Sequence, residues 1–239
     1  MTDVTRILSA VEAGDPKAAE LQVQIETALD RLDSLDGIVR LAPVQLWDFG
    51  AGAVPRKLVV HGQMIFVLDL AGGWGVRLTL NPTGDGVIEE DVALLLASTG
   101  QQIGEGVVGK MVDLVWVDQG DERRTSALLI LEEKDGALLS YDPAWMDEAG
   151  NPRLKRSFLD TPPTGMPKAV GSFDGRFYVL DALADESGQI WRYQPVGDTY
   201  PDQPDRYFVD PPPKPLVDAL DMAIDGNIYI LYADGTILK

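Results

Sequence analysis

The segment Phe173–Tyr193, FDGRFYVLDALADESGQIWRY, contains the pattern that decides the fold of this chain. Its Asp174-Gly175 pair predicts a tight hairpin turn. Two runs rich in aromatic and β-branched residues, 177–181 and 190–193, predict short strands. The same order of turn, strand, turn and strand recurs in Ile224–Lys239, IDGNIYILYADGTILK. We therefore expect a chain built from repeated β units.

Four related apolar strands mark the repeat. Each ends near a leucine, and the four leucines are 63, 49 and 51 residues apart: Leu68, Leu131, Leu180 and Leu231. A period of this size is typical of a β-propeller, in which every repeat forms one blade of four antiparallel strands. We therefore predict an all-β propeller in which one strand of each blade lies nearest the axis. These inner strands are expected at Lys57–His61, Asp113–Asp118, Lys168–Phe173 and Asp221–Ile224.

The two ends of the repeat pattern are irregular, so the prediction is three complete blades and one partial blade. Val44–Phe49 resembles an outer strand that no blade precedes, and the last repeat stops at Lys239 without an outer strand. Either Val44–Phe49 completes the last blade and closes a four-bladed ring, or the propeller is longer and truncated at its C-terminal end. We favour the second interpretation because Lys239 stands one residue before the counterpart of Tyr193.

Residues 1–37 differ from the rest and are expected to form a helical hairpin or linker, with the propeller spanning 38–239. The pair Asp15-Pro16 is a typical helix start, because Asp caps the first turn and Pro fits its geometry. Apolar residues then follow at spacings of three and four. The pattern predicts a helix at 16–35 and a shorter one at 3–12.

Composition excludes several classes of function. The 239 residues include 20 basic and 38 acidic side chains, a net charge of -18, so the chain would repel phosphate backbones and we predict no nucleic-acid binding. The chain has no cysteine, which excludes disulfides and thiolate metal sites, and its single histidine, His61, excludes a multi-histidine zinc site. No apolar run approaches the roughly 18 residues of a membrane helix. We therefore predict no membrane contact within this chain.

Five segments resemble the propeller-like region of large bacterial proteins that carry a PPM-type serine/threonine phosphatase domain. They are LDGIVRL at 35–41, DFGAGA at 48–53, GRFYVLDA at 175–182, QIWRY at 189–193 and the run 221–239. These motifs are also similar to those of sugar-lactonase-like propellers. The resemblance implies a non-catalytic sensor or interaction region, outside the cytoplasm in a membrane-anchored protein, with further blades after residue 239. The phosphatase domain itself is not in this chain, and no catalytic residue is carried over.

The mouth of the central channel is the expected binding site, since propellers bind ligands where inner strands and their loops converge. The predicted inner strands open with charged residues of alternating sign: Lys57, Asp113, Lys168 and Asp221. Such a ring would recognise a small zwitterion or a sugar acid. The alternative is a rim of ion pairs that keeps the channel solvated.

Asp181, Asp185 and Glu186 lie close together ahead of Gly188 and are candidates for a calcium site. Oxygen ligands at short spacing can hold Ca²⁺, but the strict spacing of a calcium loop is missing. We therefore predict neither a metal nor another cofactor and keep these three residues as metal candidates. His61 stands at a turn with no partner nucleophile in a recognisable elbow, and is expected to be a turn residue.

Taken together, the sequence predicts a non-catalytic propeller module of a larger signalling protein that binds a small ligand or a protein at the channel mouth. Two alternatives stay open. One is a lactonase-like hydrolase that uses a divalent metal of the calcium type, and the other is a structural spacer. The identity of the ligand does not follow from the sequence.

Overall fold

The protein is described by a computed structural model. It describes residues 16–18, 20–21, 23–24, 46–84, 86–88, 94–147, 152–183 and 187–239. The chain divides into two units, Met1–Val44 and Gln45–Lys239. In the first unit the described residues are helical, as predicted, and the rest of the predicted helices lies outside the described residues.

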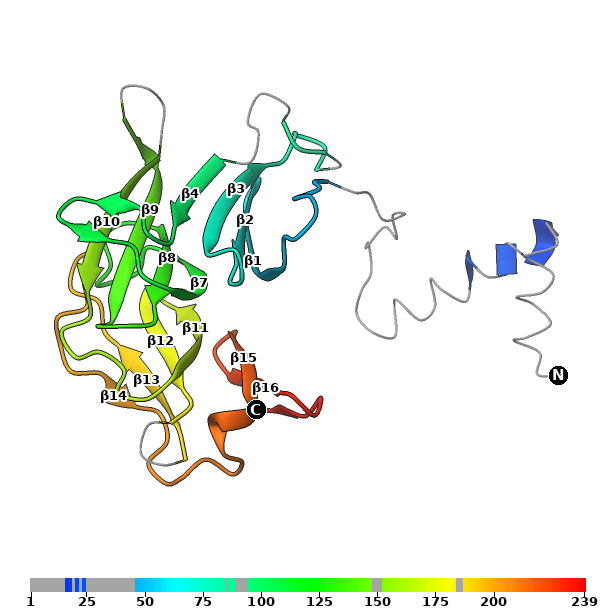
Figure 1. Cartoon of the computed structure of the whole chain (residues 1–239). Helices are drawn as coiled ribbons and strands as arrows, with labels where there is room; N and C mark the ends of the chain where they lie inside the picture. Colours follow the sequence, from blue (N-terminus) through cyan, green and yellow to red (C-terminus); the bar gives the residue numbers. More distant parts are fainter. Residues whose placement is uncertain are drawn as a thin grey trace. The chain divides into compact units, whose positions relative to one another are not determined.

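The described residues of the second unit form four antiparallel sheets in which each strand pairs with its neighbour along the chain (Figure 1). Blade 1 contains β1 (Pro55–His61), β2 (Met64–Asp69), β3 (Trp74–Thr79) and β4 (Leu94–Ser98). Blade 2 contains β7 (Met111–Val117), β8 (Ala127–Glu132), β9 (Ala137–Met146) and β10 (Pro152–Phe158). Blade 3 contains β11 (Pro167–Phe173), β12 (Arg176–Asp181), β13 (Gln189–Tyr193) and β14 (Asp205–Arg206). Blade 4 contains β15 (Ala219–Ile224), β16 (Ile228–Tyr232) and β17 (Ile237–Leu238).

Two small elements complete this description, a hairpin of β5 (Gln102–Ile103) and β6 (Gly106–Val107) and the 3-10 helix η2 (Leu216–Asp218). The predicted all-β propeller of three complete blades and one partial blade is confirmed. The predicted hairpin at Asp174-Gly175 is also present between β11 and β12. Both of its residues have positive φ, 52° and 74°, as a two-residue turn of this kind requires.

The four marker leucines define equivalent positions in the inner strands. Leu68, Leu131, Leu180 and Leu231 pair with Lys57, Asp113, Ala169 and Asp221 respectively. We call these four partners the ring positions. Each inner strand has a register shift just before its ring position. In β11 the shift lies between Pro167 and Ala169, so Lys168 falls in the irregularity and is not the fourth ring position.

Each pair of consecutive blades buries an apolar cluster between its sheets. The second strand of one blade supplies its marker leucine, and the next blade supplies the residue that follows its ring position. The pairs that share a cluster are Leu68 with Leu114, Leu131 with Val170, and Leu180 with Met222. Both faces of the second strands are therefore apolar, which explains their continuous apolar runs.

A buried carboxylate ends the second strand of the first three blades. Asp69, Glu132 and Asp181 are at most 3% exposed. Each accepts main-chain N–H groups from the loop that leads into the inner strand of its own blade. The Val54 nitrogen lies 2.7 Å from Asp69 Oδ2, and the Gly109 nitrogen lies 2.7 Å from Glu132 Oε2. These bonds fix the point where the chain enters each blade.

The predicted outer strand Val44–Phe49 is not formed in its described part, 46–49. Leu46, Trp47 and Phe49 instead pack against the apolar face of blade 1 that does not contact blade 2. Within the described residues, blade 4 has no fourth strand, so this segment does not complete it. The prediction of a strand is wrong for 46–49, because these residues pack their side chains on the face of a sheet and do not pair with a strand.

Asp181→Ala tests the role of the buried carboxylates. The Gly165 and Met166 nitrogens donate to this carboxylate at 2.9 and 2.6 Å, and both would be left without an acceptor. A hydrogen bond to a charged group contributes about 1.5–3 kcal/mol, so the loss of both should lower the free energy of unfolding in urea by about 3 kcal/mol. Asp202→Ala, at an exposed loop carboxylate, is the control and should change it by less than about 0.5 kcal/mol. Equal losses in the two variants would contradict this role.

Candidate functional site

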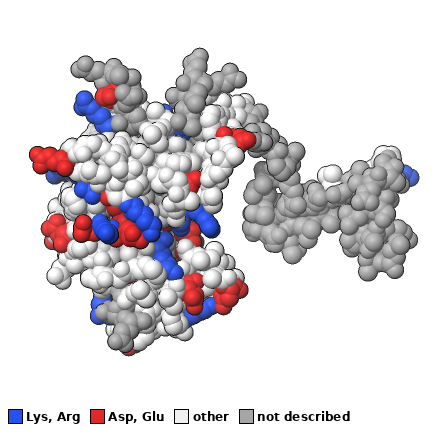
Figure 2. All heavy atoms as spheres, viewed as in Figure 1, with Lys and Arg blue, Asp and Glu red and all other residues white. Residues whose placement is uncertain are grey.

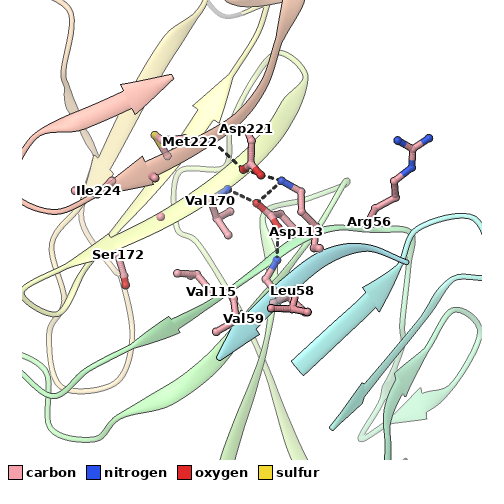
Figure 3. A pocket seen from close by; sticks show the side chains of 14 residues that line it. Arg56, Leu58, Val59, Asp113, Val115, Val170, Ser172, Asp221, Met222 and Ile224 are labelled. Atoms are coloured by element: carbon pink, nitrogen blue, oxygen red, sulfur yellow. Dashed lines mark hydrogen bonds and ion pairs between the residues drawn. The ribbon is translucent and has the colours of Figure 1, made fainter. Parts of the chain in front are cut away.

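The inner strands β1, β7, β11 and β15 enclose a hollow of about 290 Å³ on the axis of the propeller (Figure 3). Its walls are formed by residues 56–59, 113–115, 170–172 and 221–224. An inner strand has only one neighbour in its sheet, so one edge of its main chain faces the axis. The hollow therefore combines main-chain polar groups with the side chains of the ring positions.

Three of the four ring positions carry charge, and their side chains meet. Lys57 Nζ lies 3.3 Å from Asp113 Oδ2 and 2.8 Å from Asp221 Oδ1. These ion pairs connect β1 with β7 and with β15. Lys57 and Asp113 are largely buried, whereas the Asp221 side chain is 48% exposed. On the face shown in Figure 2, acidic and basic side chains likewise lie beside one another.

The Lys57 ammonium has unused hydrogen-bonding capacity. Its nitrogen is buried, yet within the described part of the chain none of its close contacts has the alignment of a hydrogen bond. The two carboxylates form ion pairs with it, and these contacts occupy at most two of its N–H donors. An ammonium has three N–H donors, so an oxygen atom of a molecule in the hollow could accept the third.

Asp113 has a structural task within the site. Its Oδ1 accepts the Leu114 N–H and its Oδ2 accepts the Val170 N–H, both at 2.8 Å, so the carboxylate ties β7 to β11. Burial raises its pKa to about 6, because water no longer stabilises the charged form. The nearby Lys57 ammonium and the two N–H groups oppose this rise, and Asp221 adds to it.

The structure brings together three of the four predicted channel residues, Lys57, Asp113 and Asp221. The fourth, Lys168, donates from its Nζ to the Val217 carbonyl oxygen and is not among the residues that line the hollow. The fourth ring position is Ala169, which adds no charge. A proline spacing could have located it, because Pro55 and Pro167 each stand two residues before a ring position.

The acidic residues considered for calcium divide into two groups. The Asp181 carboxylate is buried and accepts the Gly165 and Met166 N–H groups, while Asp185 and Glu186 lie outside the described residues. Among the residues that the structure describes, no three or more His, Cys, Asp or Glu side chains are grouped to hold a metal ion.

Two further sequence predictions concern His61 and the membrane. His61 stands at the end of β1 next to the turn, and its imidazole stacks on the Trp116 indole at 3.9 Å between ring centres. It therefore contributes to packing between blades 1 and 2. In the described residues, no helix has the length and apolarity needed to span a membrane.

Comparison with solved structures finds similar chains at low sequence identity. Streptogramin B lyase is 14% identical with a TM-score of 0.46, over 81% of this chain and 56% of the lyase. The computationally designed Ika4 protein is 13% identical with a TM-score of 0.44, over 84% of this chain and 97% of Ika4. The PQQ-bound aldose sugar dehydrogenase from Streptomyces coelicolor is 10% identical with a TM-score of 0.27, over 72% of this chain and 70% of the enzyme.

These likenesses concern the fold alone. This chain spans about half the length of streptogramin B lyase. No protein family profile matches the sequence, and no curated protein is similar enough to count as a relative. The resemblance to propellers of PPM-type phosphatase proteins stays a prediction.

The raised pKa of Asp113 predicts a pH-dependent contribution to stability. Between its ordinary value of 3.8 and the folded value of about 6, the folded state binds this proton and the unfolded state does not. The contribution of Asp113 therefore falls as pH rises through this window, by on the order of 3 kcal/mol. Unfolding free energies measured from pH 4 to 7 should show this fall in wild type relative to Asp113→Asn.

An NMR titration of the Asp113 carboxyl carbon gives an independent measurement. The midpoint is expected near 6, and Lys57→Met should raise it further because the ammonium favours the carboxylate. A midpoint below 4 in the wild type would contradict the assignment.

Proposed function

We propose that this protein is a binding module that takes a small polar molecule into the hollow at Lys57, Asp113 and Asp221. The observation that carries the proposal is the charged cluster at the wall of the hollow, in which the Lys57 ammonium contacts two carboxylates and keeps a third N–H donor. A buried donor without a partner is costly, and a structure retains one where a ligand or water completes it. The hollow is polar and partly open, as a site for such a molecule must be.

The chemistry of the walls favours a ligand with both an anionic and a cationic or hydroxyl group. Lys57 would donate to a carboxylate or hydroxyl oxygen. Asp221, which is half exposed, would accept from an ammonium or a hydroxyl group. Asp113 would hold Lys57 in position without contacting the ligand, because both of its oxygens already accept main-chain N–H groups. The ligand would contact Lys57 and Asp221. Zwitterions and sugar acids match this arrangement.

A sensor role in a larger signalling protein is the wider part of the proposal. It is supported by the resemblance of five segments to propeller regions that accompany PPM-type phosphatase domains. In such a protein, ligand binding in the channel would be communicated to another domain. Placement outside the cytoplasm, as the resemblance implies, would expose the module to small extracellular molecules.

Two other functions fit a propeller of this kind and have to be separated by experiment. Similar folds include enzymes, among them the lyase and the dehydrogenase. A lactonase-like hydrolase would depend on a divalent metal in the channel, and a structural spacer would bind nothing there. No observation in the described residues favours either of them over ligand binding.

Thermal unfolding and calorimetric titration with three probes test the proposal. We use glucuronate as the sugar acid, glycine as the zwitterion, and Ca²⁺ alone. Glucuronate or glycine should raise the unfolding temperature, and Lys57→Met should weaken that binding roughly tenfold or more, because a charged hydrogen bond is lost. Lys168→Met is the matched control and should bind like wild type, since Lys168 lies outside the hollow.

The remaining outcomes decide against the proposal. Binding of Ca²⁺ that survives in Lys57→Met, without binding of the other two probes, would favour the metal-dependent hydrolase. Absence of heat and of a thermal shift with all three probes would favour the spacer. Equal weakening in Lys168→Met and Lys57→Met would remove the hollow as the site.

A further inference from the structure

The hollow has an apolar set of side chains next to its charged cluster. Alternate residues of a strand point to the same side, so the residue two places after each ring position lies on the side of that ring position. These four residues all line the hollow, and none has a polar side chain: Val59, Val115, Gly171 and Ala223. We call them the apolar layer. The hollow is therefore charged in one layer and apolar in the next.

The other residues of the walls offer few partners for the hydroxyl groups of a ligand. Leu114, Val170 and Met222 belong to the apolar clusters between the blades. Of the described residues that line the hollow, Ser172 alone has an uncharged polar side chain, and its hydroxyl donates to the Trp116 carbonyl at 2.6 Å. A hydroxyl group that is buried without a partner is costly. The apolar layer therefore favours a hydrocarbon group over the hydroxylated ring of a sugar.

The two groups that would hold a zwitterion are in direct contact with each other. Lys57 Nζ lies 2.8 Å from Asp221 Oδ1, and the Asp221 side chain is half exposed. A ligand that pairs its carboxylate with Lys57 and its ammonium with Asp221 must therefore carry its own charges close together. Arg56 also lines the hollow, but it is exposed and its guanidinium points away from this pair (Figure 3). An α-amino acid meets the requirement, because one carbon carries both of its charged groups.

The size of the hollow limits the rest of the ligand. Its volume of about 290 Å³ is at the lower end of the range of roughly 300–1,000 Å³ that is usual for small-molecule sites. The charged groups of the ligand occupy the layer of Lys57 and Asp221. The remaining space lies beside Val59 and Val115 and suits a short side chain.

We propose, on the basis of the function proposed above, that the hollow selects an α-amino acid with a short apolar side chain, such as valine. Its carboxylate accepts the third N–H of Lys57, and its ammonium donates to Asp221. Its side chain packs against Val59 and Val115 in the apolar layer. This assignment narrows the ligand from zwitterions and sugar acids in general to one class.

Calorimetric titration of the full chain with valine, glycine and 5-aminopentanoate tests the ligand class. 5-Aminopentanoate is an isomer of valine that carries the same two charged groups at opposite ends of a straight chain. Valine should bind roughly tenfold or more tightly than either of the other two, because glycine lacks the apolar contact and the isomer separates the charges. Glycine or the isomer binding as tightly as valine would overturn the proposal. This comparison uses the wild type, so it does not depend on the folding of a variant.

Val59→Thr tests the apolar layer directly, because threonine has nearly the shape of valine and adds a hydroxyl group. Valine should bind this variant roughly tenfold more weakly, whereas the affinity for glycine should stay within about twofold, because glycine has no side chain to reach the layer. Val60→Thr is the matched control, since Val60 is the next residue of β1, is 57% exposed and does not line the hollow. Thermal unfolding shows whether each variant is folded.

Val115→Thr gives a second test of the layer from another blade and should have the same effect. Gly171 is not suitable for substitution, because an added Cβ would lie 2.8 Å from Ile224 Cδ1. Unchanged binding of valine in Val59→Thr and Val115→Thr would overturn the proposal. An equal loss of valine and glycine binding in both variants would also contradict it.

Glucuronate as a further probe separates failure of this proposal from failure of the binding function. Glucuronate binding that is lost in Lys57→Met, without any binding of valine, would keep the hollow as a binding site and overturn only the ligand class. Absence of heat with valine, glycine and glucuronate would overturn both.

Discussion

The contact between a marker leucine and the inner strand of the next blade is the interaction on which the rest of this structure depends. A four-stranded sheet of this kind is apolar on both faces, so no blade can bury its residues alone. Each blade stacks on the next blade along the chain, and this contact fully buries Leu68, Leu131 and Leu180. It also forces every blade to present one strand edge to the axis, and this edge creates the polar hollow.

The hollow follows from that stacking rather than from a dedicated binding loop. Three of its four charged residues stand at one repeated position, next to a register shift in each inner strand, and the fourth, Arg56, precedes Lys57. Asp113 uses both carboxylate oxygens to join two blades, and its burial is the cause of its raised pKa. Lys57 forms ion pairs with carboxylates from two other blades, and one of its three N–H donors is left for a further acceptor. The structural support and the proposed ligand recognition thus involve neighbouring atoms of the same cluster.

The repeat also explains where the protein departs from regularity. Ala169 stands at one ring position in place of a charged residue, so β11 adds no charge to the hollow, and the Lys168 ammonium donates to the Val217 carbonyl. In blade 4, Tyr232 replaces the buried carboxylate of the other blades, and its hydroxyl donates to the Lys214 carbonyl at 3.0 Å. In the first three blades a carboxylate fixes the loop that enters the blade, and in blade 4 the Tyr232 hydroxyl does so. Blades 1 and 4 differ most, because each has a neighbour on one face only.

The sequence by itself determined the propeller fold, the blades within this chain and the hairpins between strands, because short apolar runs and Asp-Gly turns act locally. It also indicated Lys57, Asp113 and Asp221, since they stand where inner strands begin. Only the spacing from Pro55 and Pro167 pointed to Ala169 in place of Lys168, because a register shift of one residue depends on pairing with Leu180. The sequence could not show that 46–49 packs on blade 1 without forming a strand, or which carboxylates are buried. Those features depend on contacts between residues far apart in the chain, which only the tertiary structure decides.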